Sequence, residues 1–95
     1  MQLPPLPIVW SAEKNTLLKK ARGISFEEVQ AAIDRGDVLL TEPHPNQKKY
    51  SGQFLMVVRI SEYPCMVPFV IDRKRNHVFL KTVIPNRNFK RVLDD

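Results

Sequence analysis

The chain has 95 residues, of which 43% are hydrophobic and 26% charged, a size and composition typical of one globular domain spanning residues 1–95. No run approaches the ~20 apolar residues of a membrane helix, and residues 1–7 carry prolines where a signal peptide has cationic and apolar segments. The single cysteine, Cys65, excludes an intrachain disulfide and a thiolate metal site, which favours a cytoplasmic protein.

The net charge of +5 is concentrated in the C-terminal half. Residues 1–47 hold five Lys or Arg against six Asp or Glu, a balance of −1, whereas residues 48–95 hold ten against four, a balance of +6. A basic half favours a polyanion or an acidic protein as partner, because phosphates are bound largely through summed contacts with cations. The alternative interpretation is a solvated surface without a partner.

Two helices are predicted in the N-terminal half. After a proline-rich lead-in, residues 8–10 are expected to form a short edge strand. Residues 12–22 contain no Gly or Pro and are predicted to form a helix capped by Ser11 and ended by Gly23. A capping box, S-x-x-E, opens the second predicted helix at Ser25, and apolar residues with helical spacing continue it.

The apolar period changes after Gly36, which ends the second helix. Residues 38–42 are predicted to form a short strand, and residues 43–52 a polar loop. Residues 54–60 and 65–71 are then expected to pair as a hairpin, with residues 62–64 as its turn.

Prolines and asparagines mark the end of the predicted sheet. Pro68 inside a β-rich run indicates an edge strand or a bulge, because proline removes one donor from the ladder. After a turn, residues 77–84 are predicted to form the last strand, and Asn86 is placed to cap a helix over residues 87–93. The predicted class is α+β, with two N-terminal helices, an antiparallel sheet of three to four strands and a short C-terminal helix.

The inventory of reactive residues excludes several kinds of site. Two distant histidines and one cysteine give no metal motif, so no metal or other cofactor is expected. Cys65 lies among apolar residues and is interpreted as a buried structural thiol. Core packing is the interpretation for the aromatic residues on apolar periods, namely Trp10, Phe26, Phe54, Phe69 and Phe79.

Cationic and hydrogen-bonding residues of the basic half remain as candidates. In the predicted last strand Lys81 shares a face with Phe79 and Val83, either to meet a ligand or as a lysine that reaches out to solvent. His44 stands between two prolines, where a plain surface imidazole is the alternative. Tyr50 lies outside any apolar period and is placed to stack on a base or to cover the loop. The other candidates are Lys48, Lys49, Asn86, Arg87, Lys90 and Arg91.

Three segments, in the same order, resemble the BrnT family of toxins from bacterial toxin–antitoxin pairs. Residues 10–15 (WSAEKN) resemble the family's W-D-x-x-K-x opening, and residues 22–29 (RGISFEEV) its H-G-V-S-F-E-E-A junction. Residues 79–87 (FLKTVIPNR) resemble its closing strand and S-A-R segment. Residues 42–50 are similar to a sub-branch with E-H-P-N-Q in this loop. The resemblance covers nearly the whole chain after the proline-rich start.

The resemblance implies a RelE-like fold, metal-independent cleavage of RNA that inhibits translation, and a cognate antitoxin protein as partner. The arginine of the family's closing segment corresponds to Arg87, and Lys81 lies near an arginine of its last strand. Two departures favour the alternative of a degenerate toxin that retains antitoxin binding. Arg22 stands where the family has histidine, and Ser11 where it has aspartate.

RNA cleavage needs few protein groups, because the 2′-hydroxyl of RNA can attack the adjacent phosphate. In this hypothesis Arg87 and Lys81 hold the phosphate, and His44 or Tyr50 assists proton transfer. The backbone of the RNA is held by Lys48, Lys49, Lys90 and Arg91. The rival hypothesis is a non-catalytic module whose basic half binds nucleic acid or an acidic partner. The sequence leaves the oligomeric state open.

Overall fold

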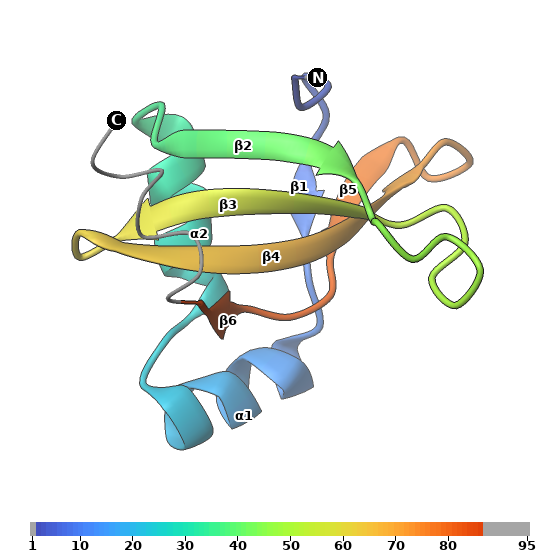
Figure 1. Ribbon diagram of the computed structural model, residues 1–95. Coiled ribbons are helices and arrows are strands. Elements are labelled where there is room, and N and C mark those ends of the chain that lie inside the picture. Colours follow the sequence, from blue (N-terminus) through green and yellow to red (C-terminus); the bar gives the residue numbers. More distant parts are fainter. Residues whose placement is uncertain (1, 87–95) are drawn as a thin grey trace.

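A computed structural model describes residues 2–86 and has α+β architecture, with the helices set apart from one mixed sheet (Figure 1). In spatial order the sheet consists of β1 (Ile8–Val9), β5 (His77–Leu80), β4 (Tyr63–Asp72), β3 (Phe54–Ile60) and β2 (Val38–Pro43). The sixth strand, β6 (Ile84–Pro85), pairs with β4 beyond the end of β5. Only β1 is parallel to its neighbour. The described sheet thus has more strands than predicted, and the helix expected over residues 87–93 lies outside the described residues.

Both predicted helices are present in the structure, and their predicted capping residues form the expected hydrogen bonds. Helix α1 (Ala12–Arg22) begins where the Ser11 hydroxyl accepts a hydrogen bond from a backbone N–H, and it ends at Gly23, whose φ of 66° is the left-handed conformation that glycine adopts readily. Helix α2 (Phe26–Asp34) begins with the reciprocal capping box of Ser25 and Glu28. No described helix is long and apolar enough to cross a membrane.

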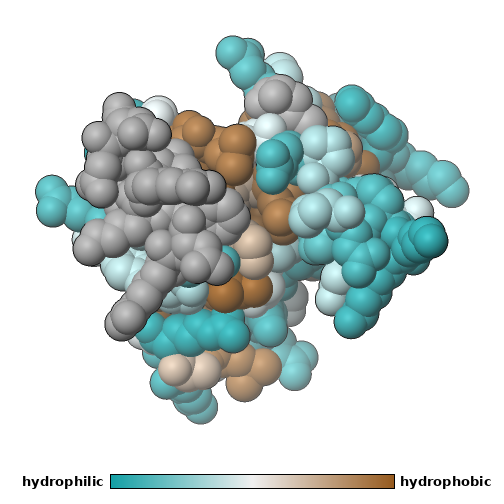
Figure 2. Space-filling view, viewed as in Figure 1, coloured by the Kyte–Doolittle hydropathy of each residue, from teal (hydrophilic) through white to brown (hydrophobic). Residues whose placement is uncertain are grey.

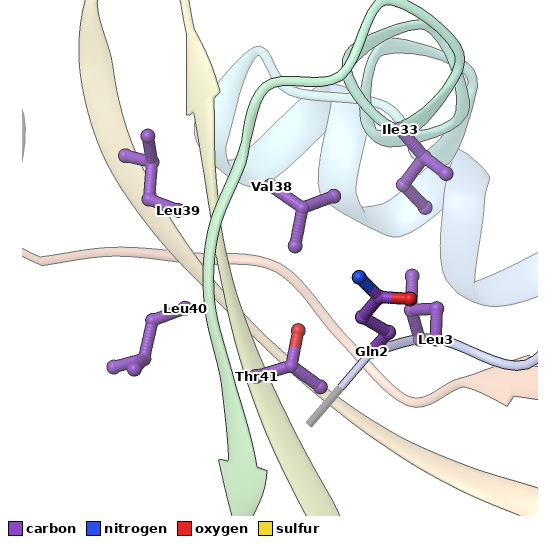
Figure 3. A pocket seen from close by; sticks show the side chains of 7 residues that line it. All are labelled: Gln2, Leu3, Ile33, Val38, Leu39, Leu40 and Thr41. Carbon is purple, nitrogen blue, oxygen red and sulfur yellow. The ribbon is translucent and has the colours of Figure 1, made fainter.

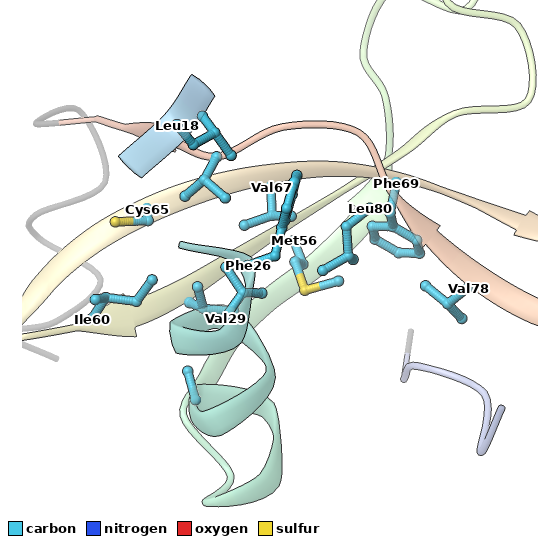
Figure 4. Close-up of a cluster of buried hydrophobic side chains, with 13 residues drawn as sticks. Leu18, Phe26, Val29, Met56, Ile60, Cys65, Val67, Phe69, Val78 and Leu80 are labelled. Carbon is cyan, nitrogen blue, oxygen red and sulfur yellow. The ribbon is translucent and has the colours of Figure 1, made fainter. Parts of the chain in front are cut away.

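Helix α2 packs against one face of the sheet and forms the core with it (Figure 4). Side chains alternate along β3, so Met56 and Val58 meet α2 whereas Leu55 and Val57 lie on the opposite face, here called the outer face. Cys65 belongs to this core, as predicted, and burial raises the pKa of its thiol to about 11. The core cluster comprises Leu18, Phe26, Val29, Ala32, Met56, Val58, Ile60, Cys65, Val67, Phe69, Val78, Leu80 and Val83.

Most of the predicted core aromatics lie where expected. Phe26 and Phe69 are fully buried, and each stacks on a partly buried ring, Trp10 and Phe54 respectively, with centroids 5.6 Å apart. Phe79 is the exception. It lies one position away from buried Val78 and Leu80 on β5 and therefore points to the outer face, where its ring is 6.5 Å from that of His77.

The turn between β3 and β4 is shorter than predicted. Ile60 pairs with Tyr63, so only Ser61 and Glu62 form the turn, and Tyr63 and Pro64 already belong to β4. Both turn residues have positive φ, 51° and 62°, the geometry of a type I′ turn. The prediction of a turn over residues 62–64 was wrong because no Gly or Asn marks this turn in the sequence.

Pro68 lies in a central strand, so the expected edge position is wrong, but the alternative of a bulge is confirmed. The register of β4 and β5 places Lys81 opposite Pro68, and the Lys81 N–H donates to the Pro68 carbonyl at 2.8 Å. In a regular antiparallel pair Pro68 would donate back, but proline has no N–H. Pairing resumes at Met66 and Ile84, so two residues, 82 and 83, stand opposite one residue of β4.

This bulge also corrects the predicted last strand. Residues 77–84 do not form one strand, because β5 ends at Leu80 and β6 begins at Ile84. The extra residue changes the alternation of side chains, so Val83 is fully buried in the core. Lys81 stays on the outer face, with its ammonium 5.7 Å from the centre of the Phe79 ring. Lys81 therefore shares a face with Phe79 but not with Val83.

Candidate functional site

A pocket of about 360 Å³ opens on the outer face of the sheet, beside the bulge. It brings together three candidates that lie far apart in the sequence, His44, Tyr50 and Lys81. Apolar side chains of the sheet border the hydrophilic loop that follows β2, seen at the right of Figure 2. Among residues 2–86 the lining consists of His44, Tyr50, Gln53, Met66, Pro68, Lys81, Thr82 and Ile84.

His44 is positioned by the end of the β2–β3 ladder. Its N–H donates to the Gln53 carbonyl at 2.9 Å, which continues the pairing one step beyond Pro43 and Phe54. Gln47 closes the loop, because its amide nitrogen donates to the carbonyls of His44 and Gln53 and its amide oxygen accepts from a backbone N–H. The loop is therefore held by its own polar side chains, and the imidazole projects from a fixed point.

The imidazole of His44 has one occupied and one available nitrogen. Its Nδ1 accepts a hydrogen bond from the N–H of Asn46 at 3.0 Å. An accepting Nδ1 carries no proton, so the neutral ring carries its proton on Nε2. The ring lies 4.4 Å from that of Tyr50, centroid to centroid. Nε2 is thus the nitrogen through which the neutral His44 side chain donates a hydrogen bond to a ligand.

The electrostatic character of the pocket is cationic. Lys81 contributes the one ammonium of the described lining, and no Asp or Glu lines it. Lys48 and Lys49 are exposed in the adjoining loop and do not line the pocket, although the Lys49 ammonium lies 5.3 Å from the centre of the Tyr50 ring. Such an arrangement favours an anionic ligand.

Arg22 anchors the wall of the pocket from behind. Its guanidinium donates to the carbonyl of Val83 at 2.6 Å and so ties the C-terminal end of α1 to the bulge that carries Lys81 and Thr82. Arg22 does not line the pocket. Its place at this position is explained by a structural contact with the bulge.

We expect Arg22→Ala to loosen the bulge without unfolding the protein. Loss of one hydrogen bond from a charged donor should raise the amide exchange rate of residues 81–84 by about tenfold. Hydrogen–deuterium exchange read on peptides covering this segment measures the effect, with Lys20→Ala, an exposed cation on the same helix, as control. Equal exchange in both variants would show that Arg22 does not hold the bulge.

Other lining residues escaped the sequence analysis. Gln53 follows a glycine in a polar loop, and Thr82 was placed inside a continuous strand, so neither carried a signal. Met66, Pro68 and Ile84 form the apolar floor on the outer face of β4 and β6. Their proximity follows from the pairing of these two strands. The pairing of His44 with Gln53 was detectable only by extending the hairpin register beyond Phe54.

Three predicted cations, Arg87, Lys90 and Arg91, lie outside the described residues, as does the cap expected from Asn86. Across residues 2–86, no group of three or more His, Cys, Asp or Glu side chains is placed to hold a metal ion.

A larger hollow of about 500 Å³ lies at the β2 edge of the sheet (Figure 3). Leu39 and Leu40 point to one side of β2 and Val38 and Thr41 to the other, because the ladder is shifted between Val38 and Leu40. Gln2, Leu3 and Ile33 also line it, and the described lining contains no ionisable side chain. This hollow offers no group for acid–base chemistry.

Comparison of the chain with models of protein families, with curated proteins and with solved structures finds no match.

Proposed function

We propose that the protein is a metal-independent endoribonuclease, a cytoplasmic toxin of the BrnT type with a RelE-like fold that a cognate antitoxin neutralises. One observation carries the proposal. His44 and Tyr50 from a loop, and Lys81 from the bulge more than 30 residues further on, line one pocket whose described lining contains no acidic side chain. The resemblance of residues 10–15, 22–29 and 79–87 to the BrnT segments supports the same activity.

The cleavage step uses the RNA as its own nucleophile. The 2′-oxygen gives its proton to water and attacks phosphorus, the bond from phosphorus to the 5′-oxygen breaks, and the 5′-oxygen takes a proton from water. The products are a 2′,3′-cyclic phosphate and a 5′-hydroxyl. The ammonium of Lys81 stabilises the negative charge on the phosphorane. His44 is suited to assist this proton transfer by donating a hydrogen bond from Nε2–H to the departing 5′-oxygen, because its Nδ1 accepts from the Asn46 N–H. Tyr50 holds the imidazole in place through ring contact.

Further cations hold the substrate in this proposal. Arg87 follows the described residues directly and shares the phosphate with Lys81. The backbone of the RNA is gripped by Lys48, Lys49, Lys90 and Arg91, whose contacts are additive and sensitive to salt.

The test is cleavage of a defined single-stranded RNA by the purified protein in EDTA. The same RNA with 2′-deoxy substitutions serves as the control for the nucleophile, and Arg87→Ala for the site. We expect cleavage that survives chelation, requires the 2′-hydroxyl and falls by at least about 10² in the variant. If the folded parent leaves RNA intact, with and without ribosomes, the protein is a binding module or a degenerate toxin.

Expression in bacteria separates the active toxin from these alternatives. An active ribonuclease should arrest growth, and co-expression of the cognate antitoxin should restore it. A protein that binds a small neighbouring protein without arresting growth fits the degenerate toxin, and one that does neither fits the passive binding module.

A further inference from the structure

We propose that the pocket holds one nucleobase of the single-stranded substrate and reads its edge through Gln53 and Thr82, so that cleavage is selective for a base. The choice of RNA as the molecule that carries this base rests on the proposed function. Two polar side chains of the lining, Gln53 and Thr82, have no part in the proposed cleavage step.

Gln53 offers a free amide to the pocket. Its backbone is fully engaged, because its carbonyl accepts from His44 and Gln47 and its N–H donates to the carbonyl of Tyr50. Its side-chain amide has no hydrogen-bond partner among the described residues. One amide supplies both donors and an acceptor, the combination that recognises the edge of a base.

Thr82 supplies a second free group on the other side of the pocket. Its hydroxyl has no partner among residues 2–86, although the backbone of the neighbouring residues is fixed by Pro68 and Arg22. The bulge takes Thr82 out of the regular pairing, since residues 82 and 83 lie opposite a single residue of β4. A hydroxyl held by a rigid backbone discriminates better than one on a mobile loop.

The floor suits the flat face of a base. Met66, Pro68 and Ile84 are apolar and come from adjacent paired strands, so a base laid on them removes apolar surface from water. The volume of about 360 Å³ lies at the small end of the range for small-molecule sites, roughly 300–1,000 Å³, which fits one nucleotide and excludes a duplex. A base can enter only when it is unstacked, so the substrate must be single-stranded there.

The base-reading groups adjoin the groups proposed for cleavage. Thr82 follows Lys81 directly, and Gln53 lies opposite His44, one step beyond the last pair of the β2–β3 ladder. Neighbouring positions in a ladder lie about 5 Å apart, comparable to the separation of a phosphate from its own sugar and base. The base in the pocket is therefore the one whose phosphate is cleaved.

The experiment measures the affinity of the protein for the four nucleoside 3′-monophosphates, which carry base and phosphate but cannot be cleaved. Titrations followed by NMR give the affinity and the residues that respond. We expect one base to bind about tenfold more tightly than the weakest, with shifts at Gln53 and Thr82. Gln53→Met and Thr82→Val, which keep the size of the side chain, should each remove most of this preference.

Matched variants and a second readout make the outcome decisive. Gln30→Met and Thr16→Val, both on helices away from the pocket, should leave the preference unchanged, and Lys81→Met should weaken all four nucleotides alike. Equal affinity for all four, or a preference untouched by both pocket variants, overturns the base subsite even if RNA is cleaved. A preference that depends on Gln53 and Thr82 supports the subsite even if the cleavage assay fails, in which case only the proposed activity falls.

Discussion

Lys81→Met is expected to lower the rate of RNA cleavage by a factor of about 10² to 10⁴. The variant removes the one ammonium of the described lining, the group that we propose stabilises the phosphorane. Methionine keeps the aliphatic stem, and the backbone N–H that donates to Pro68 is unchanged, so the bulge should persist. The measurement is the single-turnover rate on a defined RNA at saturating protein.

A second lysine provides the control for a general effect of charge. Lys74 lies exposed in the turn between β4 and β5, so Lys74→Met removes one positive charge at a distance from the pocket. We expect this variant to retain nearly full activity. If both variants lose activity equally, Lys81 acts only through the overall field of the basic surface. An unchanged thermal midpoint for both would show that neither effect comes from unfolding.

Asn15→Ala is expected to lower the free energy of unfolding by about 1–3 kcal/mol. Asn15 is buried between the helices, with 6% of its surface exposed. Its amide oxygen accepts from the N–H of Phe26 at 2.8 Å, and its amide nitrogen donates to the Glu27 carboxylate at 2.7 Å. Alanine leaves the buried N–H of Phe26 without an acceptor, which accounts for the main loss.

The same variant has a pH signature. The hydrogen bond from Asn15 lowers the pKa of the Glu27 carboxyl below its ordinary value. A lowered pKa contributes stability above the ordinary pKa of Glu, and this contribution is lost as the pH falls through the lowered value. The difference in the free energy of unfolding between Asn15→Ala and the parent should therefore become smaller in acid.

Urea unfolding at pH 7 and in acid measures this difference. Thr16→Ala, an exposed change on the same helix, is the control and should have little effect. A loss for Asn15→Ala no larger than that for Thr16→Ala would mean that Asn15 does not support the start of α2.

The helices were predictable because their signals are local. Ser11, Gly23 and the capping box at Ser25 act within one turn of the positions where they stand. The strand order, by contrast, depends on pairings between distant segments, and no local pattern announced the parallel contact of β1 with β5. The split of β5 from β6 follows from the residue opposite Lys81, which only the register of the sheet reveals.

The site was only partly predictable, because residue types can be read from the sequence whereas contacts between distant segments cannot. His44, Tyr50 and Lys81 stood out by residue type, but their proximity arises from a hairpin end and a bulge on two different strands. Gln53 and Thr82 are uncharged residues of ordinary type, so only the geometry of the pocket singles them out. The candidate residues could be named from the sequence, whereas their common pocket and its further lining required the fold.

Pro68 interrupts the regular pairing of the sheet and also lines the pocket. A residue with a backbone N–H at position 68 could donate a hydrogen bond to the Lys81 carbonyl, which Pro68 cannot do. The pairing of β5 with β4 could then continue beyond Leu80. Each step of that continuation would draw Thr82 back into the ladder and flatten the wall of the pocket. A substitution that makes the sheet more regular at position 68 would thus remove the hollow itself, so greater stability of the sheet and the presence of the pocket oppose each other there.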